Sequence, residues 1–234
     1  MRLASAVRVD TNGGRIFVDG TPITSAVSYA WKNGSIHTPA PDLAYSSVSG
    51  VRRLFDSWVG GITSNPLYIL IVANSSYVAQ WQIQYALTVN SAYGSTTGAG
   101  WFNARSIATF GVNSFVDQGN GTRRAFQSWT GDLLSQSPNS SIIKDGPKTV
   151  SALWKTQYVL TIDVKPPGSG TVSPPAGSYW FDKGSYVRVT RNPDNGYRFY
   201  YWELDGTNVG SGNRYYVLMN SPHNLAAIFR TSRA

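Results

Sequence analysis

Apolar and polar residues alternate along short segments of this chain, and that two-residue period is typical of β-strands with one buried face. The clearest case is residues 185–190, where Val187 and Val189 alternate with Tyr186 and Arg188. Residues 85–89 and 158–164 are also rich in β-branched and aromatic side chains and end near Gly, Pro or Asn. No window of twelve residues shows a helical stripe. The pattern therefore predicts an all-β protein with little helix.

The same arrangement of anchors occurs three times along the chain, which is the signature of a repeat protein. Each copy contains Phe-x-x-Trp, followed by a further aromatic residue, and each is preceded by another Trp. These ordered anchors predict three repeat modules, which we call module 1 (residues 1–84), module 2 (85–157) and module 3 (158–234). The predicted repeat core consists of Trp31, Phe55, Trp58, Trp81, Trp101, Phe126, Trp129, Trp154, Trp180, Phe199, Trp202 and Phe229.

The boundaries between modules carry a Gln-Tyr dipeptide, at Gln84-Tyr85 and at Gln157-Tyr158. Each dipeptide joins the expected last strand of one module to the expected first strand of the next, with no Gly- or Pro-rich linker. We therefore expect three small β modules docked end to end with little freedom between them. The sequence leaves open whether their sheets form sandwiches or resemble a β-grasp.

The Phe-x-x-Trp spacing makes a specific structural prediction. In a regular strand, residues i and i+3 point to opposite faces of the sheet. If both rings are buried in one core, the strand must contain a bulge between them. Burial of a large aromatic side chain contributes about 2–3 kcal/mol, so we expect both rings to be core residues.

Module 3 resembles a known family. Gly170-Thr171-Val172, Lys183-Gly184-Ser185, the Trp202 region and the closing segment 225–229 are similar to the divergent internalin B-type repeat of bacterial and archaeal surface and secreted proteins. Module 2 resembles the version common in archaeal secreted proteins, and module 1 departs most from the pattern. The resemblance implies extracellular exposure in tandem arrays, no catalysis by the repeat and no catalytic residues to transfer.

Composition narrows the classes of function. Only 14% of residues are charged, and the net charge is +8. The chain has no cysteine, so disulfides and zinc–thiolate sites are excluded. No apolar run reaches about 18 residues, so we expect no membrane span. A basic chain can bind anionic glycans or nucleic acid, but no block of five basic residues occurs, and we expect no nucleic-acid partner.

Side chains suited to catalysis or metal binding are sparse. Glu203 is the only glutamate, and Asp19, Asp145 and Asp205 each precede Gly, as turn residues do. The two histidines, His37 and His223, have no partner at metal-ligand spacing, and a Ser-His-Asp triad would have to assemble across modules. We therefore predict no catalytic residue, no metal site, no cofactor and no enzymatic activity.

Basic and aromatic residues outside the shared pattern are the candidates for recognition. The arginine pairs recur at one repeat position, where they either bind anions, pack over the neighbouring Trp or hold an Asp at a junction. The tyrosine pairs occur only in module 3 and either form a binding patch or belong to a half-buried strand face. The candidate interaction surface is Arg52, Arg53, Arg123, Arg124, Tyr200, Tyr201, Tyr215 and Tyr216.

These observations favour a structural or adhesive array of a cell-surface protein, with another protein or a second copy as partner. Strand edges offer a route to self-assembly, and residues 3–9 are the candidate for an exchanged strand. The alternative is a carbohydrate-binding or spacer appendage of a secreted hydrolase, with a glycan as partner.

Overall fold

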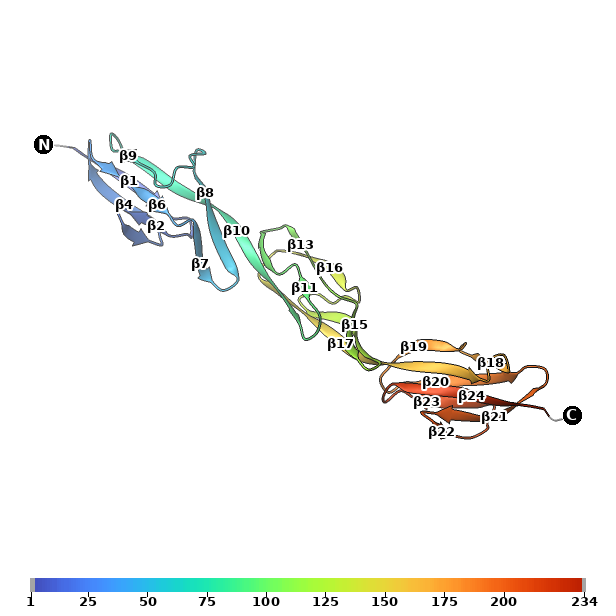
Figure 1. Cartoon of the computed structure of the whole chain (residues 1–234). Coiled ribbons are helices and arrows are strands. Elements are labelled where there is room, and N and C mark those ends of the chain that lie inside the picture. The colour runs from blue at the N-terminus through green and yellow to red at the C-terminus, as the bar shows by residue number, and fades with distance from the viewer. Residues whose placement is uncertain (1–2, 233–234) are drawn as a thin grey trace.

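The computed structural model describes residues 3–232, and this range contains β-strands and no helix, which confirms the all-β prediction. Figure 1 shows three bodies that follow one another along an extended rod, in the order of the sequence. Separate clusters of buried apolar residues lie within 7–79, 87–150 and 160–229. Each of the three predicted ranges therefore contains its own core.

Each module has a larger sheet and a smaller three-stranded sheet on either side of its core. The larger sheet of module 1 runs β4 (Val27–Lys32), β1 (Ala4–Asp10), β10 (Ser75–Ser91), β8 (Val51–Trp58) and β7 (Ala44–Val48). Its smaller sheet runs β3 (Thr21–Ile23), β2 (Ile16–Val18) and β6 (Pro39–Pro41), with a separate pair of β5 (Ile36–His37) and β9 (Ile69–Leu70).

Modules 2 and 3 repeat this topology. In module 2 the larger sheet runs β12 (Gly100–Asn103), β10, β17 (Lys148–Lys165), β15 (Thr122–Gly131) and β14 (Phe115–Gly119), opposite β11 (Thr96–Thr97), β13 (Ile107–Val112) and β16 (Asn139–Ile143). In module 3 it runs β19 (Gly177–Asp182), β17, β24 (His223–Thr231), β21 (Tyr197–Leu204) and β22 (Thr207–Asn208), opposite β18 (Gly170–Ser173), β20 (Tyr186–Pro193) and β23 (Arg214–Leu218).

Two long strands connect the modules. β10 has 17 residues and β17 has 18, which corresponds to about 56–60 Å of extended chain at about 3.3 Å per residue. The first half of each strand closes one module and the second half opens the next (Figure 1). The prediction of a direct strand-to-strand junction without a linker is confirmed.

The N-terminal strand is not available for exchange in this structure. β1 lies inside the larger sheet of module 1, where it pairs in parallel with β10 and antiparallel with β4. Both of its edges are therefore hydrogen-bonded within its own module. The module completes its own sheet with β1, so the candidate strand is not exchanged in this arrangement, and exchange between copies stays a prediction.

The predicted bulge is present in every Phe-x-x-Trp segment. The pairing register shifts between Phe55 and Ser57, between Phe126 and Ser128, and between Phe199 and Tyr201, each opposite consecutive residues of the partner strand. The bulged residue lets the Phe and the Trp face the same core. Their rings lie 5.8, 5.5 and 5.1 Å apart in modules 1, 2 and 3.

The repeated tryptophans are the centre of each core. Trp58, Trp129 and Trp202 are fully buried, and each indole N–H donates to a backbone carbonyl. Phe229 is also buried. The Phe of each motif is half-buried and packs against the same core, so it is less enclosed than the Trp. Half-buried side chains that pack against the cores are Trp31, Phe55, Trp81, Phe126, Trp154 and Phe199.

Trp101 and Trp180 are not core residues, contrary to the sequence-based expectation. Trp101 is 37% exposed, and Phe102 beside it packs against the module 2 core instead. In module 3, Phe181 likewise faces the core. The turn serine follows Trp31 by four residues but follows Trp101 by five. A one-residue slip moves a strand side chain to the opposite face, so Trp101 and Trp180 point away from the core.

Candidate functional site

The predicted site residues make their most extensive polar and aromatic contacts at the two junctions between modules. At the first junction, Gln84 pairs with Arg52 on β8 and with Asn103 on β12. Three strands from two modules therefore run side by side at this point. The Arg52 Nε donates to Gln84 Oε1 at 2.8 Å, and the Gln84 amide donates to Asn103 Oδ1 at 2.7 Å. The Arg52 guanidinium lies 4.6 Å from the Trp101 ring centroid, so the Trp displaced from the core covers the junction.

The second junction repeats this arrangement with different partners. The Arg123 Nε donates to Gln157 Oε1 at 2.8 Å, and its guanidinium lies 4.5 Å from the Trp180 ring centroid. Gln157 donates to Asp182 Oδ1 at 2.7 Å, and Lys155 pairs with the same carboxylate at 2.8 Å. Burial alone would raise the pKa of Asp182, but the bonds from Lys155 and Gln157 outweigh it and lower that pKa.

A close glycine–proline contact reinforces each junction. Gly50, in the β7–β8 turn, has a φ of +73°, and a Cβ added there would lie 2.8 Å from Pro147 Cβ. At the second junction, Gly121 has a φ of +69°, and its added Cβ would lie 3.0 Å from Pro222 Cβ. Only glycine has both the backbone conformation and the space for these contacts.

The four arginines do not form a free interaction surface, which corrects the expectation for them. Arg52 and Arg123 are engaged at the junctions as described. Arg124 bonds to Thr156 Oγ1 and lies 4.6 Å from the Tyr93 ring centroid. Arg53 lies against the turn at Gly13. Of the alternatives left open by the sequence, packing over an aromatic ring is the one found for Arg52, Arg123 and Arg124.

The four candidate tyrosines of module 3 are divided between the inside and the outside of the module. Tyr215 packs against the module core, so it is not a surface residue. Tyr200 is the bulged residue of its motif and projects outwards, with the Arg230 guanidinium 3.5 Å from its ring centroid and Tyr201 at 5.0 Å. Tyr216 is 49% exposed on β23. The structure therefore separates Tyr200 and Tyr216 onto different sheets.

His37 forms an arrangement that sequence analysis did not find, because its partner Asp19 is 18 residues away. The His37 Nδ1 lies 2.6 Å from Asp19 Oδ2, and its Nε2 lies 2.9 Å from Ser35 Oγ. The Thr38 amide donates to the other Asp19 oxygen at 2.8 Å. Burial alone would raise the pKa of Asp19, but the bonds from His37 and Thr38 outweigh it and lower that pKa.

These atoms resemble a Ser-His-Asp triad, but the serine has a different role. The Ser35 hydroxyl donates to the Lys32 carbonyl at 2.6 Å. Ser106 and Ser185 close the equivalent turns of modules 2 and 3 with the same bond at 2.7 Å. The proton that a nucleophilic serine would give to histidine is therefore held by the backbone.

A second Asp–His pair occurs in module 3. The His223 Nδ1 lies 2.6 Å from Asp205 Oδ2, and the Asn224 amide donates to the other Asp205 oxygen at 2.8 Å. The His223 Nε2 is nearer to Asn220 Oδ1, at 2.8 Å, than to Ser221 Oγ, at 3.2 Å. In both modules the aspartate belongs to an Asp-Gly turn. The shared effect is to fasten that turn to a neighbouring strand.

Lys144 is a buried charge that sequence analysis also missed. It has no exposed surface, and its ammonium donates at 2.7 Å to the carbonyl of Ala86, within module 2 and two residues from the first junction at Gln84. Burial lowers its pKa, and the nearby Lys148 acts in the same direction. Backbone hydrogen bonds place Ile71 and Met219 at the same position in modules 1 and 3, and both are buried apolar residues. The sequence signal that could have revealed Lys144 is a charged residue at a repeat position that is apolar in modules 1 and 3.

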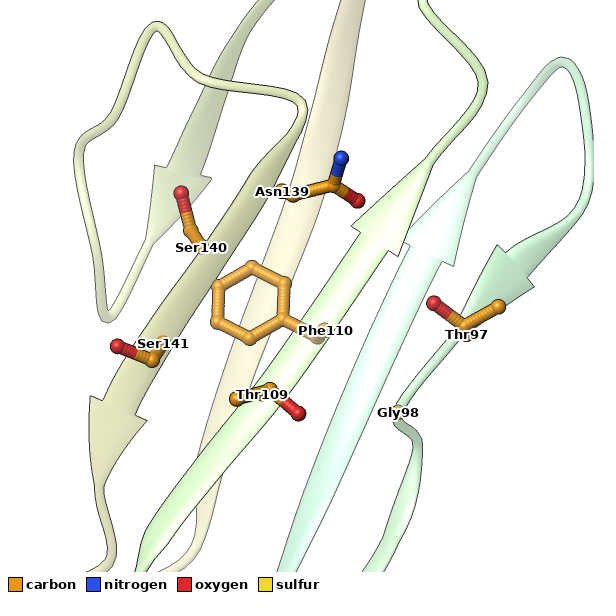
Figure 2. A pocket seen from close by; sticks show the side chains of 7 residues that line it. All are labelled: Thr97, Gly98, Thr109, Phe110, Asn139, Ser140 and Ser141. Atoms are coloured by element: carbon orange, nitrogen blue, oxygen red, sulfur yellow. The ribbon is translucent and has the colours of Figure 1, made fainter.

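A shallow groove lies on the outer face of the smaller sheet of module 2, with a volume of about 490 Å³. Figure 2 shows Thr97, Thr109 and Asn139 along its three neighbouring strands. Beside the groove, a Cβ added at Gly111 would lie 2.3 Å from Asn139 Oδ1, so a larger residue there would displace the Asn139 side chain. The lining offers hydrogen bonds but no titratable group for acid–base chemistry. It comprises Thr97, Gly98, Thr109, Phe110, Asn139, Ser140 and Ser141.

Within residues 3–232, no three His, Asp or Glu side chains are close enough together to hold a metal ion. The same range contains no helix with the length and apolar character needed to cross a bilayer.

Comparison with known proteins identifies one part of the chain. Residues 160–233 match a family model described as the divergent InlB B-repeat domain. This range lies within module 3, where the sequence resemblance is strongest, and it confirms that resemblance for the third repeat. No curated protein matches the chain.

Proposed function

We propose that this chain is a stiff extracellular array that serves as a structural or adhesive part of a cell-surface protein, without a catalytic role. The observation that supports it most directly is the three-stranded overlap at each Gln-Tyr junction. The strand that closes one module is the strand that opens the next, so the two cores share a continuous backbone ladder.

The overlap resists bending for a simple physical reason. A bend at Gln84 would break its pairing with β8 or with β12, and it would also separate Arg52 from Trp101. Cross-strand pairs contribute about 0.2–1 kcal/mol each, and an exposed cation–π contact contributes about 0.5–1 kcal/mol. Several such contacts must be lost together at either junction, so the straight arrangement is strongly favoured.

The match of module 3 to the InlB B-repeat family supports the extracellular location. The absence of cysteine does not oppose it, because the modules hold their shape through buried tryptophans and shared strands. The archaeal type of surface protein, inferred from module 2, is part of the same proposal.

Small-angle X-ray scattering on the full chain tests the mechanical part of the proposal. We expect the profile of an elongated particle whose maximum dimension stays constant between low and high salt. The double variant Arg52→Ala/Arg123→Ala should show a broader distribution of dimensions, and Arg8→Ala, an exposed arginine of module 1, should not. A compact or salt-dependent wild-type particle would contradict stiffness.

Protease treatment of intact host cells tests the location. An extracellular array should be cleaved while a cytoplasmic marker in the same cells survives. Protection of the chain until the cells are lysed would overturn the extracellular part of the proposal.

A further inference from the structure

The outer face of the smaller sheet in module 3 carries exposed tyrosines beside arginines. Val187 and Val189 on β20 and Val217 on β23 face the core, so the alternate residues of both strands face outwards. The cross-strand register gives three rows. They pair Tyr186 with Leu218, Arg188 with Tyr216, and Thr190 with Arg214. We call these six residues the Tyr/Arg face.

Tyr186 is 69% exposed and Tyr216 is 49% exposed, so both rings are accessible to a ligand. Arg191, on the same strand, bonds to Asn213 and covers the Phe199 ring. By contrast, within residues 3–232 neither Arg188 nor Arg214 makes a hydrogen bond or an ion pair to another side chain. Their guanidinium groups remain available for bidentate bonds to an external anion.

The surrounding outward positions carry no opposing charge. Beside β20, the outward residues of β18 are Thr171 and Ser173, so the face has two cations and no carboxylate. The smaller sheet of module 2 differs, because its outward rows pair Ile107 with Ile143 and Thr109 with Ser141. Of these two faces, only the one in module 3 therefore combines aromatic rings with cations.

We propose that the Tyr/Arg face binds an acidic polysaccharide chain. The carboxylates of the sugar chain pair with Arg188 and Arg214, and the sugar rings stack on Tyr186 and Tyr216. Diagonal neighbours on adjacent strands lie about 7–8 Å apart, so the two arginines and the two tyrosines form neighbouring pairs. Three rows span about 13 Å along the strands, which suits a short oligosaccharide lying flat on the sheet.

The number of cations favours a polysaccharide over a nucleic acid. Strongly salt-dependent binding to a nucleic-acid backbone rests on about 6–10 phosphate contacts, and this face offers two guanidinium groups. The net charge of +8 favours the approach of any polyanion, but it does not supply the paired rings and cations. The face therefore selects for a polymer that has both sugar rings and carboxylates.

Binding of the full chain to oligogalacturonate, measured by isothermal titration calorimetry, tests the proposal. A neutral glucan of equal length and a single-stranded DNA serve as comparison ligands. We expect oligogalacturonate to bind, the neutral glucan to bind at least tenfold more weakly, and affinity to fall as salt rises from 50 to 200 mM. Arg188→Gln/Arg214→Gln should lower affinity at least tenfold, and Tyr186→Ala/Tyr216→Ala at least threefold.

The matched control is Lys183→Gln/Arg198→Gln, which removes two exposed positive charges from other surfaces of module 3. This control should retain wild-type affinity within twofold. All variants change exposed side chains, and an unchanged melting temperature verifies that each is folded. The proposal is overturned if the wild-type chain does not bind oligogalacturonate at millimolar concentration or if the control loses as much affinity as the Arg188/Arg214 variant. Equally tight DNA binding with the same dependence on these arginines would also overturn it.

Discussion

Replacement of Lys144 by methionine should make this protein more stable. The ammonium of Lys144 is fully buried and has one hydrogen bond, to the Ala86 carbonyl. Module 3 shows that the position accepts methionine, since Met219 is fully buried there. The variant Lys144→Met therefore installs a side chain that the repeat already uses, of similar length and without the charge.

The expected size of the effect follows from opposing contributions. Burial of an ammonium carries a penalty of several kcal/mol, and its hydrogen bond offsets about 1.5–3 kcal/mol. Methionine removes that penalty and fills about the same volume as the buried lysine stem, so it adds little apolar burial. Against this, the Ala86 carbonyl loses its donor, which costs about 1–3 kcal/mol. We expect a net gain of about 1 kcal/mol in the free energy of unfolding, at the lower end of the range for buried charges replaced by apolar groups.

The pH dependence gives an independent check. Burial lowers the pKa of Lys144 in the folded chain below the ordinary value of 10.5. Between the lowered pKa and 10.5, the unfolded chain binds more protons than the folded chain, so wild-type stability rises with pH in that window. The advantage of Lys144→Met should therefore shrink as pH approaches 10.5.

Urea denaturation of the full chain, with hydrogen exchange of module 2 peptides, measures both effects. Lys148→Met, which changes a neighbouring lysine that pairs with Asp145 at the surface, is the matched control and should not stabilise the protein. A Lys144→Met variant that is less stable than wild type at pH 7 would refute the reasoning.

Three further predictions concern the core, a junction and acid stability. Trp129→Ala should destabilise module 2 by about 3–5 kcal/mol in urea melts, whereas Trp101→Ala, outside the core, should cost less than half as much. Gly50→Ala should weaken protection from hydrogen exchange at the first junction, because the added Cβ clashes with Pro147. The control Gly34→Ala has a similar positive φ but nothing within 4 Å of its added Cβ, so it should leave that protection unchanged. The pKa of Asp19 is lowered in the folded chain, so its contribution to stability should be present above pH 3.8 and be lost as pH falls through the folded-state pKa. In acid denaturation, Asp19→Asn should not show this loss of stability.

Local sequence patterns predicted the features that depend on neighbouring residues. The two-residue alternation revealed the outward positions of Tyr186 and Arg188, and the Phe-x-x-Trp spacing required the bulge that all three modules contain. The Gln-Tyr dipeptides indicated junctions without linkers, because strand-forming residues continue through them.

Features that depend on pairing between distant segments could not be found this way. Trp101 was assigned to the core because a slip of one residue is invisible without the strand register. Asp19 and His37 meet only because a hairpin turn folds over a neighbouring strand. The engagement of Arg52 with Trp101 joins two modules, so no pattern within one module could indicate it.

The central claim is that the modules form one stiff rod, and distances between spin labels on neighbouring modules test it most directly. The chain has no cysteine, so labels can be introduced at the exposed strand positions Ser28, Gln118 and Thr207 in modules 1, 2 and 3. Double electron–electron resonance on the Ser28/Gln118 and Gln118/Thr207 pairs should give single distance distributions. Their widths should match that of the within-module pair Ser28/Ser47. Distributions that are broad or multimodal across either junction, beside a narrow within-module control, would contradict the account.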